Sequence, residues 1–381
     1  MIFYIGYYDC EKIKKEKRKV SPAAVNKMEY IIYSLKNILD EEIEVISPAE
    51  TELYCFVKGK KLEISKKLFV KTFSSFSSRN KIVRILGHFL TKITFCTYLF
   101  KNIKKGDHII VYHSLVYMKI IEWIKLLKKC KLTIEIEELY SDVTENENLR
   151  KKEIKFFQIA DDYIFITSLL REIINTEKPA VISHGTYKAI PNHNFNFKDN
   201  KIHVVYAGTF NKIKGGVFKA ISVAEYLDES YVMEILGNGS QKEIQEVKNA
   251  IENASKPGSC EIRYVGYKFG DDFNAYIQAC DIGLSTQQAE GKFNATSFPS
   301  KILMYMSNGL RVVSVKIPAV ETSDVGEYVY YYEKQTPEEI AKTIKSINLS
   351  EIYDGRNVLE KMDVKFNYNF SFMLRNKYQK N

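Results

Sequence analysis

The sequence lacks the cysteine spacing that builds zinc sites and disulfide frameworks. Its six cysteines are scattered over 381 residues, and none of them forms a C-x-x-C pair. Zinc sites and disulfide-stapled domains both need clustered or regularly spaced thiols, so this pattern argues against either one. A chain without disulfides suits a reducing compartment, and we therefore expect a cytoplasmic protein.

Long hydrophobic runs are also missing. The most lipophilic long stretch, residues 82–103, is interrupted by Arg84, His88 and Lys92 and is too polar to span a bilayer comfortably. The apolar run at the N-terminus is too short for a signal peptide, and its charges lie on the wrong side. These features predict a soluble or peripheral protein.

Acidic residues are scarce in the first half of the chain. Residues 1–190 carry 33 Lys and Arg against 24 Asp and Glu, whereas residues 191–381 carry 23 of each, so the whole net charge of +9 belongs to the first half. Within residues 51–105, thirteen basic residues face only Glu52 and Glu63. One basic half and one neutral half argue against a uniform nucleic-acid-binding coat.

Short, β-rich apolar runs alternate with segments of helical period along nearly the whole chain. This alternation is typical of βαβ units with parallel sheets, and the length suits two domains. We predict an α/β fold of two doubly wound Rossmann-like domains, 1–190 and 191–360, that face a central cleft. A polar segment at 187–200 is the expected hinge, and an amphipathic tail, 361–381, is expected to pack back on one of the domains.

The first strand of the second half leads into an anion-binding pattern at residues 202–216. A buried strand is followed by Gly208, a loop, and Lys214 just before a helix. Glycine lets a ligand approach the backbone, and the amides and dipole of a helix start favour an anion, to which Lys214 adds a full charge. An ordinary turn with a solvated lysine is the alternative. Two further strands end in glycine turns, at 234–240 and 264–268.

A second anion-binding pattern lies at residues 295–314. Ser297 is expected to cap a helix with Pro299 in its first turn, and Ser300 and Lys301 then present amides, a hydroxyl and an ammonium at the positive helix end. A pyrophosphate would match this arrangement. The alternative is a well-capped helix with an exposed lysine.

These segments resemble the retaining glycosyltransferases of family 4, which have the GT-B fold and include bacterial polysaccharide and lipopolysaccharide transferases. Residues 298–313 resemble the family's donor-binding helix, 207–215 its diphosphate segment, and 235–239 and 265–267 two further turns, the latter near the nucleotide base. The resemblance implies a nucleotide-diphosphate sugar as donor, with UDP the expected nucleotide. The donor-binding residues that it implies are Gly208, Thr209, Lys214, Gly239, Tyr267, Glu290, Ser297, Phe298, Pro299, Ser300 and Lys301.

Two features depart from the family pattern. Thr209 stands where the diphosphate turn usually carries an arginine, and Lys301 is a candidate for the missing charge. Thr296 and Met304 stand where the family commonly has two glutamates, the second of which binds the donor ribose, and Glu290 is a candidate substitute. These departures bear on the identity of the donor sugar more than on the class of reaction.

The first half resembles the family less. His113 follows an expected strand and resembles a cleft histidine that lies near the transferred sugar, although a lone histidine at this place also fits a structural role. Glu137, Glu138 and Tyr140 follow the next strand on the expected acceptor side. The two glutamates are candidates to hold acceptor hydroxyls, and a solvated acidic turn is the alternative.

The resemblance predicts a metal-independent glycosyltransferase that moves a sugar to a hydroxyl of a glycan or lipid-linked glycan, with retention of configuration, in cell-surface polysaccharide synthesis. Its catalytic residues would be His113, Lys214 and Lys301. No Asp-x-Asp stands at a strand end, so we expect no metal and no cofactor. The alternatives are a nucleotide-sugar 2-epimerase of the same fold and a non-catalytic polyanion-binding module. The latter would not need the donor motifs, and we expect no nucleic-acid partner.

The basic first half of the chain also predicts where the protein is located in the cell. The lysines of 58–71 and the helix expected at 82–103 combine cationic and apolar side chains, which suits an anionic membrane surface. The family's acceptors are often glycans on lipid diphosphate carriers. We predict peripheral attachment to the inner face of the cytoplasmic membrane; the alternative is a basic face that only keeps the protein soluble.

Overall fold

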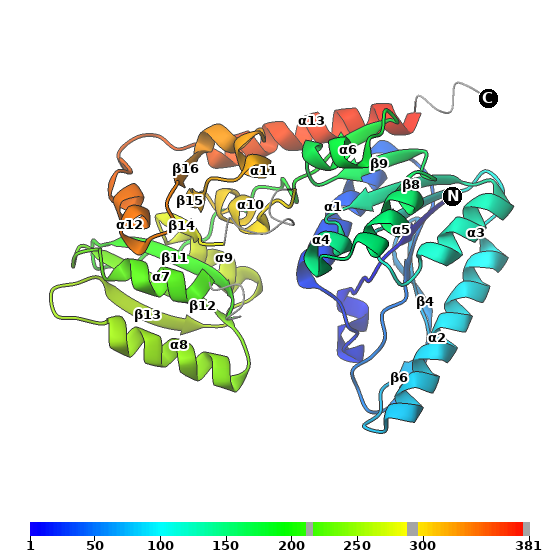
Figure 1. Cartoon of the computed structure of the whole chain (residues 1–381), viewed down its shortest axis with the longest axis horizontal. Helices are drawn as coiled ribbons and strands as arrows, with labels where there is room; N and C mark the ends of the chain where they lie inside the picture. Colours follow the sequence, from blue (N-terminus) through cyan, green and yellow to red (C-terminus); the bar gives the residue numbers. More distant parts are fainter. Residues whose placement is uncertain (211–215, 288–295, 376–381) are drawn as a thin grey trace. The chain divides into compact units, whose positions relative to one another are not determined.

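The computed structural model describes residues 1–210, 216–287 and 296–375. It divides into two compact units, Met1–Thr186 together with the chain from Phe366, and Tyr187–Lys365 (Figure 1). Each unit is built around its own sheet of mainly parallel strands with helices between them. The predicted α/β class with two doubly wound domains is therefore confirmed.

The N-terminal unit contains an eight-stranded sheet in the order β10-β9-β8-β7-β1-β2-β5-β4, in which only β4 runs antiparallel to its neighbour. Its central strands are almost wholly buried, as expected for apolar strands covered on both faces. The chain order reverses between β1 and β7, which opens a crevice at their carboxyl ends. The strands are β1 (Ile2–Ile5), β2 (Ile43–Ser47), β4 (Lys61–Ser65), β5 (Leu68–Thr72), β7 (His108–Tyr112), β8 (Lys131–Ile136), β9 (Asp162–Phe165) and β10 (Ala180–Ile182), with a separate pair, β3 (Phe56–Val57) and β6 (Ser75–Phe76).

Helices connect the parallel strands of this unit. The longest, α2, leads from the β3–β6 pair to β7, and α3 connects β7 to β8. The helices are α1 (Pro22–Ile38), α2 (Lys81–Asn102), α3 (Met118–Lys128), α4 (Tyr140–Thr144), α5 (Glu147–Phe157) and α6 (Ser168–Ile174).

The C-terminal unit contains a six-stranded parallel sheet in the order β13-β12-β11-β14-β15-β16. Its chain order reverses between β11 and β14, so a ligand crevice is again expected at their carboxyl ends. The strands are β11 (Ile202–Thr209), β12 (Tyr231–Asn238), β13 (Glu261–Gly266), β14 (Ile282–Ser285), β15 (Arg311–Val315) and β16 (Val329–Tyr332). The helices are α7 (Gly216–Ala224), α8 (Gln241–Ala254), α9 (Gly270–Gln278), α10 (Ser300–Ser307), α11 (Pro318–Glu321), α12 (Pro337–Lys345) and α13 (Gly355–Arg375).

The predicted hinge segment, 187–200, is anchored on the C-terminal unit. The backbone amide of Ile190 donates to the carbonyl of Ser307 at 2.9 Å, and that of His193 donates to the Gln278 side chain at 2.8 Å. The last turns of α13 belong to the N-terminal unit, where the ring of Phe366 lies 5.4 Å from that of Tyr30 on α1. The predicted tail, 361–381, therefore begins in one unit and continues in the other.

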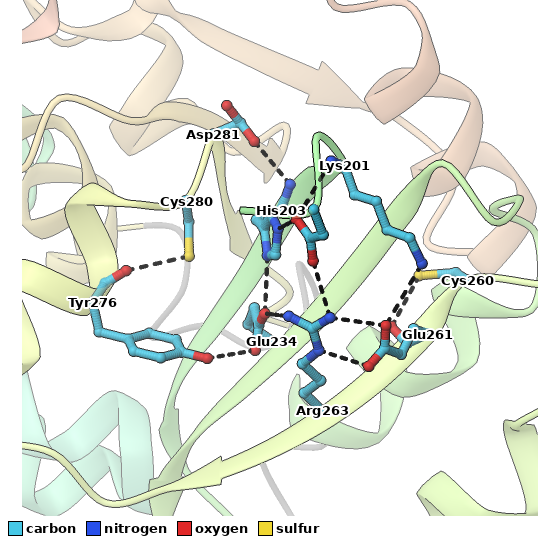
Figure 2. A network of polar contacts seen from close by, with 10 residues as sticks. Lys201, His203, Glu234, Cys260, Glu261, Arg263, Tyr276, Cys280 and Asp281 are labelled. Carbon is cyan, nitrogen blue, oxygen red and sulfur yellow. Dashed lines mark hydrogen bonds and ion pairs between the residues drawn. The ribbon is translucent and has the colours of Figure 1, made fainter. Parts of the chain in front are cut away.

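A buried polar network joins three neighbouring strands of the C-terminal unit (Figure 2). Glu234, fully buried on β12, lies 2.9 Å from His203 Nδ1, accepts a hydrogen bond from the Tyr276 hydroxyl at 2.8 Å, and lies 3.4 Å from Arg263 Nη1. Asp199 lies 2.9 Å from His203 Nε2 and accepts from Arg263 at 3.0 Å. Burial alone acts to lower the pKa of His203, but its two carboxylate partners raise that pKa overall. The network therefore holds β11, β12 and β13 together through a protonatable imidazole.

Candidate functional site

The carboxyl edge of the C-terminal sheet gathers predicted donor-binding residues from separate segments. Gly208 and Thr209 end β11, Gly239 follows β12, and Tyr267 follows β13. Because these strands are parallel, their carboxyl ends meet along one edge of the sheet. Helix α10, which begins at Ser300, contributes a further side chain to the same edge.

Lys301 extends across β11 from the first turn of α10. Its Nζ lies 3.9 Å from the ring centroid of Tyr206, whose π face attracts the ammonium. A Cβ at Gly208 would lie 2.5 Å from this Nζ and 2.9 Å from Cε. The lysine therefore occupies the space where a side chain on Gly208 would stand, and the sheet edge beside the exposed Thr209 carries a fixed cation.

Gly208→Ala is expected to weaken donor binding while it leaves the fold intact. The new Cβ meets chiefly the end of the flexible Lys301 side chain, which can move aside, so the melting temperature should change little. The displaced ammonium would no longer lie over β11, and we expect nucleotide-sugar affinity to fall about tenfold to hundredfold, as for loss of a hydrogen bond to a charged group. Calorimetric titration and thermal unfolding measure the two properties.

Gly283→Ala is the matched control, because its Cβ would overlap the ring of buried Tyr305 and should destabilise the protein instead. If Gly208→Ala lost stability as Gly283→Ala does, or kept full affinity, the close approach of Lys301 to Gly208 would have no functional meaning.

Tyr305 fixes α10 against the sheet. Its fully buried hydroxyl accepts a hydrogen bond from the Ala207 amide at 2.8 Å and donates to the Leu284 carbonyl at 3.4 Å. Burial raises the pKa of Tyr305, so the hydroxyl keeps the proton that it donates. The position of Lys301, one turn earlier on the same helix, is thereby tied to the ends of β11 and β14.

The start of α10 corrects one expectation from the sequence. The helix begins at Ser300 with Pro299 as its N-cap, and no side chain of the described residues caps it, so Ser297 does not have the predicted capping role. The proline ring fixes the backbone ahead of the first turn, and buried Phe298 anchors it. Because no side chain of the described residues accepts from them at this cap, the first amides of α10 are available to an anion.

Two exposed aromatic rings follow β13. Tyr267 and Phe269 are 66% and 70% exposed, and their ring centroids lie 6.3 Å apart at an interplanar angle of 28°. Aromatic faces of this kind stack on nucleobases. The ring predicted to lie near the nucleotide base is therefore accessible, and Phe269 extends its surface.

The remaining donor predictions have different outcomes. Gly239 precedes α8, where Ser240 and Glu243 form a reciprocal capping box, so this turn is held by the protein itself. The predictions on Lys214 and Glu290 fall outside the described residues.

In the N-terminal unit, acidic side chains cluster at the carboxyl end of β8. Glu137 Oε1 lies 3.5 Å from Nζ of buried Lys27, and Glu135 accepts a hydrogen bond from the Tyr4 hydroxyl. Burial, followed by the charge of Glu137, raises the pKa of Glu135 to about 8. Glu137 is thus paired with a buried lysine, and Glu138 is partly buried beside it.

His113 is enclosed in the same unit. Its side chain is 2% exposed, its Nε2 lies 2.9 Å from Glu153 Oε1, and its ring packs 4.7 Å from that of Phe157. Glu153 also accepts hydrogen bonds from the amides of Tyr140 and Ser141, at 3.0 and 2.8 Å. Burial acts to raise the pKa of Glu153, but its hydrogen bonds with His113 and Ser141 lower that pKa overall. In this arrangement His113 orients the start of α4, including Tyr140, through Glu153.

A cavity at the carboxyl edge of the N-terminal sheet was not predicted from the sequence. It has a volume of about 260 Å³ and lies between the segments that follow β1, β2 and β7 and helix α2. Its lining combines apolar side chains with Lys19, Lys92 and the pair His88 and Glu50, whose Nδ1 and Oε1 lie 2.7 Å apart. In the sequence, His88 and Lys92 stood out only as interruptions of a hydrophobic stretch; their i, i+4 spacing was the signal for a shared helix face.

Residues 201–348 match the protein-family model described as Glycosyl transferases group 1. No curated protein shows significant sequence similarity to the chain. Among similar solved structures is one described as trehalose-6-phosphate from E. coli bound with UDP-2-fluoro glucose, with a TM-score of 0.68 and 10% identity, covering 97% of this chain and 96% of that chain. Another is an α,α-trehalose-phosphate synthase (UDP-forming) from Burkholderia xenovorans in complex with glucose-6-phosphate, with a TM-score of 0.65 and 10% identity over 100% and 99% of the two chains.

These comparisons confirm the predicted enzyme class and fold. The C-terminal unit contains a group 1 glycosyltransferase domain, and the chain is a glycosyltransferase. The structural similarity extends over both units and shows the GT-B fold of two Rossmann-like domains.

Proposed function

We propose that the chain transfers a sugar from a UDP-sugar to a hydroxyl of a glycan or lipid-linked glycan, with retention of configuration, in the synthesis of a cell-surface polysaccharide. The C-terminal unit would bind the donor and the N-terminal unit the acceptor. One observation carries the proposal: the Lys301 ammonium is held over Gly208 at the carboxyl edge of the glycosyltransferase domain. A fixed cation at this edge suits the diphosphate of a sugar donor.

The proposed reaction breaks the bond between the anomeric carbon and the terminal phosphate oxygen of the donor. Negative charge then grows on the departing UDP, where Lys301 and the amides at the start of α10 would stabilise it. Tyr206 and Tyr305 hold these groups before the donor arrives, so little reorganisation is needed during the reaction. The exposed rings of Tyr267 and Phe269 offer a stacking surface for uracil.

The cavity of the N-terminal unit supports an acceptor that carries negative charge. Lys19 and Lys92 contribute two cations to the lining, beside the Glu50 carboxylate and its partner His88. A phosphate or diphosphate next to the accepting sugar would complement them. In same-face transfer, the proton of the acceptor hydroxyl passes to the leaving phosphate oxygen as the new glycosidic bond forms.

A panel of nucleotide sugars tests this function. We expect UDP-sugars to raise the melting temperature of the full chain, because a ligand that binds only the folded state adds about 2.7 kcal/mol at a hundred times its Kd. GDP- and ADP-sugars serve as controls for the base. If no nucleotide sugar stabilised the protein, the proposal would be wrong.

Product analysis with the donor alone separates the proposed transferase from the 2-epimerase. A transferase leaves the sugar unchanged or releases it slowly to water, whereas an epimerised nucleotide sugar would favour the alternative. Tight, salt-sensitive binding of nucleic acid without any affinity for nucleotide sugars would favour the polyanion-binding module instead.

A further inference from the structure

Two neighbouring helices of the N-terminal unit expose large apolar side chains. Helices α2 and α3 pack against each other, with the ring of Phe95 on α2 lying 6.1 Å from that of Tyr117 at the start of α3 (Figure 1). On α3 the exposed side chains are Trp123, Leu126 and Leu127. On α2 they are Ile82, Val83, Ile85, Leu86, Phe89, Leu90 and Ile93. We call these ten residues the α2–α3 face.

The opposite side of α2 is fastened to the domain. Gly87, Thr91, Phe95 and Leu99 are buried, Thr91 Oγ1 donates to the Ser74 carbonyl at 3.0 Å, and the Phe95 ring packs edge-on against Phe73. The exposed residues 82, 86, 89 and 93 follow the helical repeat on the other side of the helix. The core contacts of α2 are therefore made by its other side, and its exposed apolar side chains are additional to them.

By length and composition, α2 is the one helix of the described residues that is long and apolar enough to cross a membrane, which corrects the expectation that this stretch is too polar to do so, and only 22% of its most apolar part is buried. Crossing would require α2 to leave its contacts with Ser74 and Phe73. Lying flat, it keeps these contacts and still offers its apolar side to a bilayer, as amphipathic interfacial helices do.

The charge around the α2–α3 face is strongly positive. Residues 81–129 contain ten Lys and Arg, and their only acidic residues are Asp107 and Glu122. Lys81, Arg84, Lys119 and Lys129 are exposed along the two helices. Two helices that expose both apolar side chains and cations complement a bilayer with anionic headgroups.

Three of the six lysines of 58–71, which the sequence predicted to meet the membrane, are paired with acidic residues. Lys60 lies 2.6 Å from Glu16 and Lys67 2.6 Å from Asp40, and Lys61 pairs with Glu44. Acidic residues from other parts of the unit thus offset half of the lysines in that segment.

We infer that the α2–α3 face is a membrane-docking surface, which inserts its apolar side chains into the interface of an anionic bilayer while the surrounding lysines and arginines meet the headgroups. Insertion removes the exposed aromatic and aliphatic side chains from water. The inference rests on the N-terminal unit alone, and its test does not depend on donor binding.

Trp123 supplies a direct readout, because it is the chain's single tryptophan and is 60% exposed in this face. We expect its emission to shift to shorter wavelength when the full chain is mixed with vesicles of phosphatidylglycerol and phosphatidylcholine, and the protein to sediment with them. Pure phosphatidylcholine vesicles should bind more weakly, and added salt should weaken binding to the anionic vesicles.

Phe89→Glu should reduce binding to the anionic vesicles about tenfold or more, since burial of a phenylalanine is lost and a negative charge is added. Phe372→Glu on α13 is the matched control, because Phe372 and Phe89 are similarly exposed, at 61% and 57%. Unchanged Trp123 emission and no sedimentation with anionic vesicles would overturn the inference. Equal effects of the two variants on vesicle binding would also overturn it. So would the finding that the protein binds no vesicles but forms a dimer that Phe89→Glu dissociates.

Discussion

Lys301→Ala is expected to lower kcat/KM for sugar transfer by roughly a hundredfold to a thousandfold, the loss seen when one preorganised donor to a developing negative charge is removed. The ammonium lies 3.9 Å from the Tyr206 ring at the end of β11, where the diphosphate of the donor is proposed to bind. Thr209, the neighbouring residue at the end of β11, has no charge to replace it. Steady-state kinetics with the donor identified by the nucleotide-sugar panel would measure the loss.

Lys342→Ala is the matched control for this substitution. Lys342 lies in the same unit, its side chain is 78% exposed, and its pairing with Glu339 is a surface contact at 3.8 Å. It should keep the activity of the unchanged protein. If both lysine variants lost the same activity, or if Lys301→Ala kept full activity, the role assigned to Lys301 would have to be abandoned.

Glu234→Leu is expected to destabilise the C-terminal unit by about 3–5 kcal/mol, because it removes one partner from a buried charged network. Glu234 is fully buried, and its loss would leave Nδ1 of His203 and the Tyr276 hydroxyl without their carboxylate partner (Figure 2). Hydrogen exchange of the β11–β13 amides would report this loss. The fluorescence of Trp123, in the other unit, would show whether the effect stays local.

Glu261→Gln provides the comparison for Glu234→Leu. Glu261 also binds Arg263, at 2.7 Å, but its side chain is 46% exposed, so its contribution to stability should be below about 1 kcal/mol. If the β11–β13 amides exchanged at similar rates in the two variants, the buried Glu234 would contribute no more to stability than the half-exposed Glu261.

The sequence identified Gly208 and Lys301 as candidate donor-binding residues, but it did not predict that they contact each other. Gly208 and Lys301 were each expected near a diphosphate, because a glycine turn after a strand and a lysine at a helix start have local signatures. Their mutual contact has no such signature, since it joins segments that only the sheet brings together. The start of α10 was misplaced for a local reason: Pro299 itself occupies the cap position that Ser297 was expected to fill.

The N-terminal unit was harder to predict because its important features depend on burial. A histidine after a strand looks the same in sequence whether it faces a ligand or, as His113 does, a buried Glu153. Likewise, the basic count of 51–105 does not show that Lys60, Lys61 and Lys67 are paired with acidic residues from other elements. The cavity beside α2 arises from three loops and a helix, and no single segment encodes it.

A crystal structure of the full chain with UDP bound would show whether Lys301 and the start of α10 bind the donor diphosphate. We expect the diphosphate within hydrogen-bonding distance of Lys301 Nζ and of the first amides of α10, with uracil against Tyr267. A diphosphate bound away from the carboxyl edge of the C-terminal sheet, or in the cavity of the N-terminal unit, would contradict it.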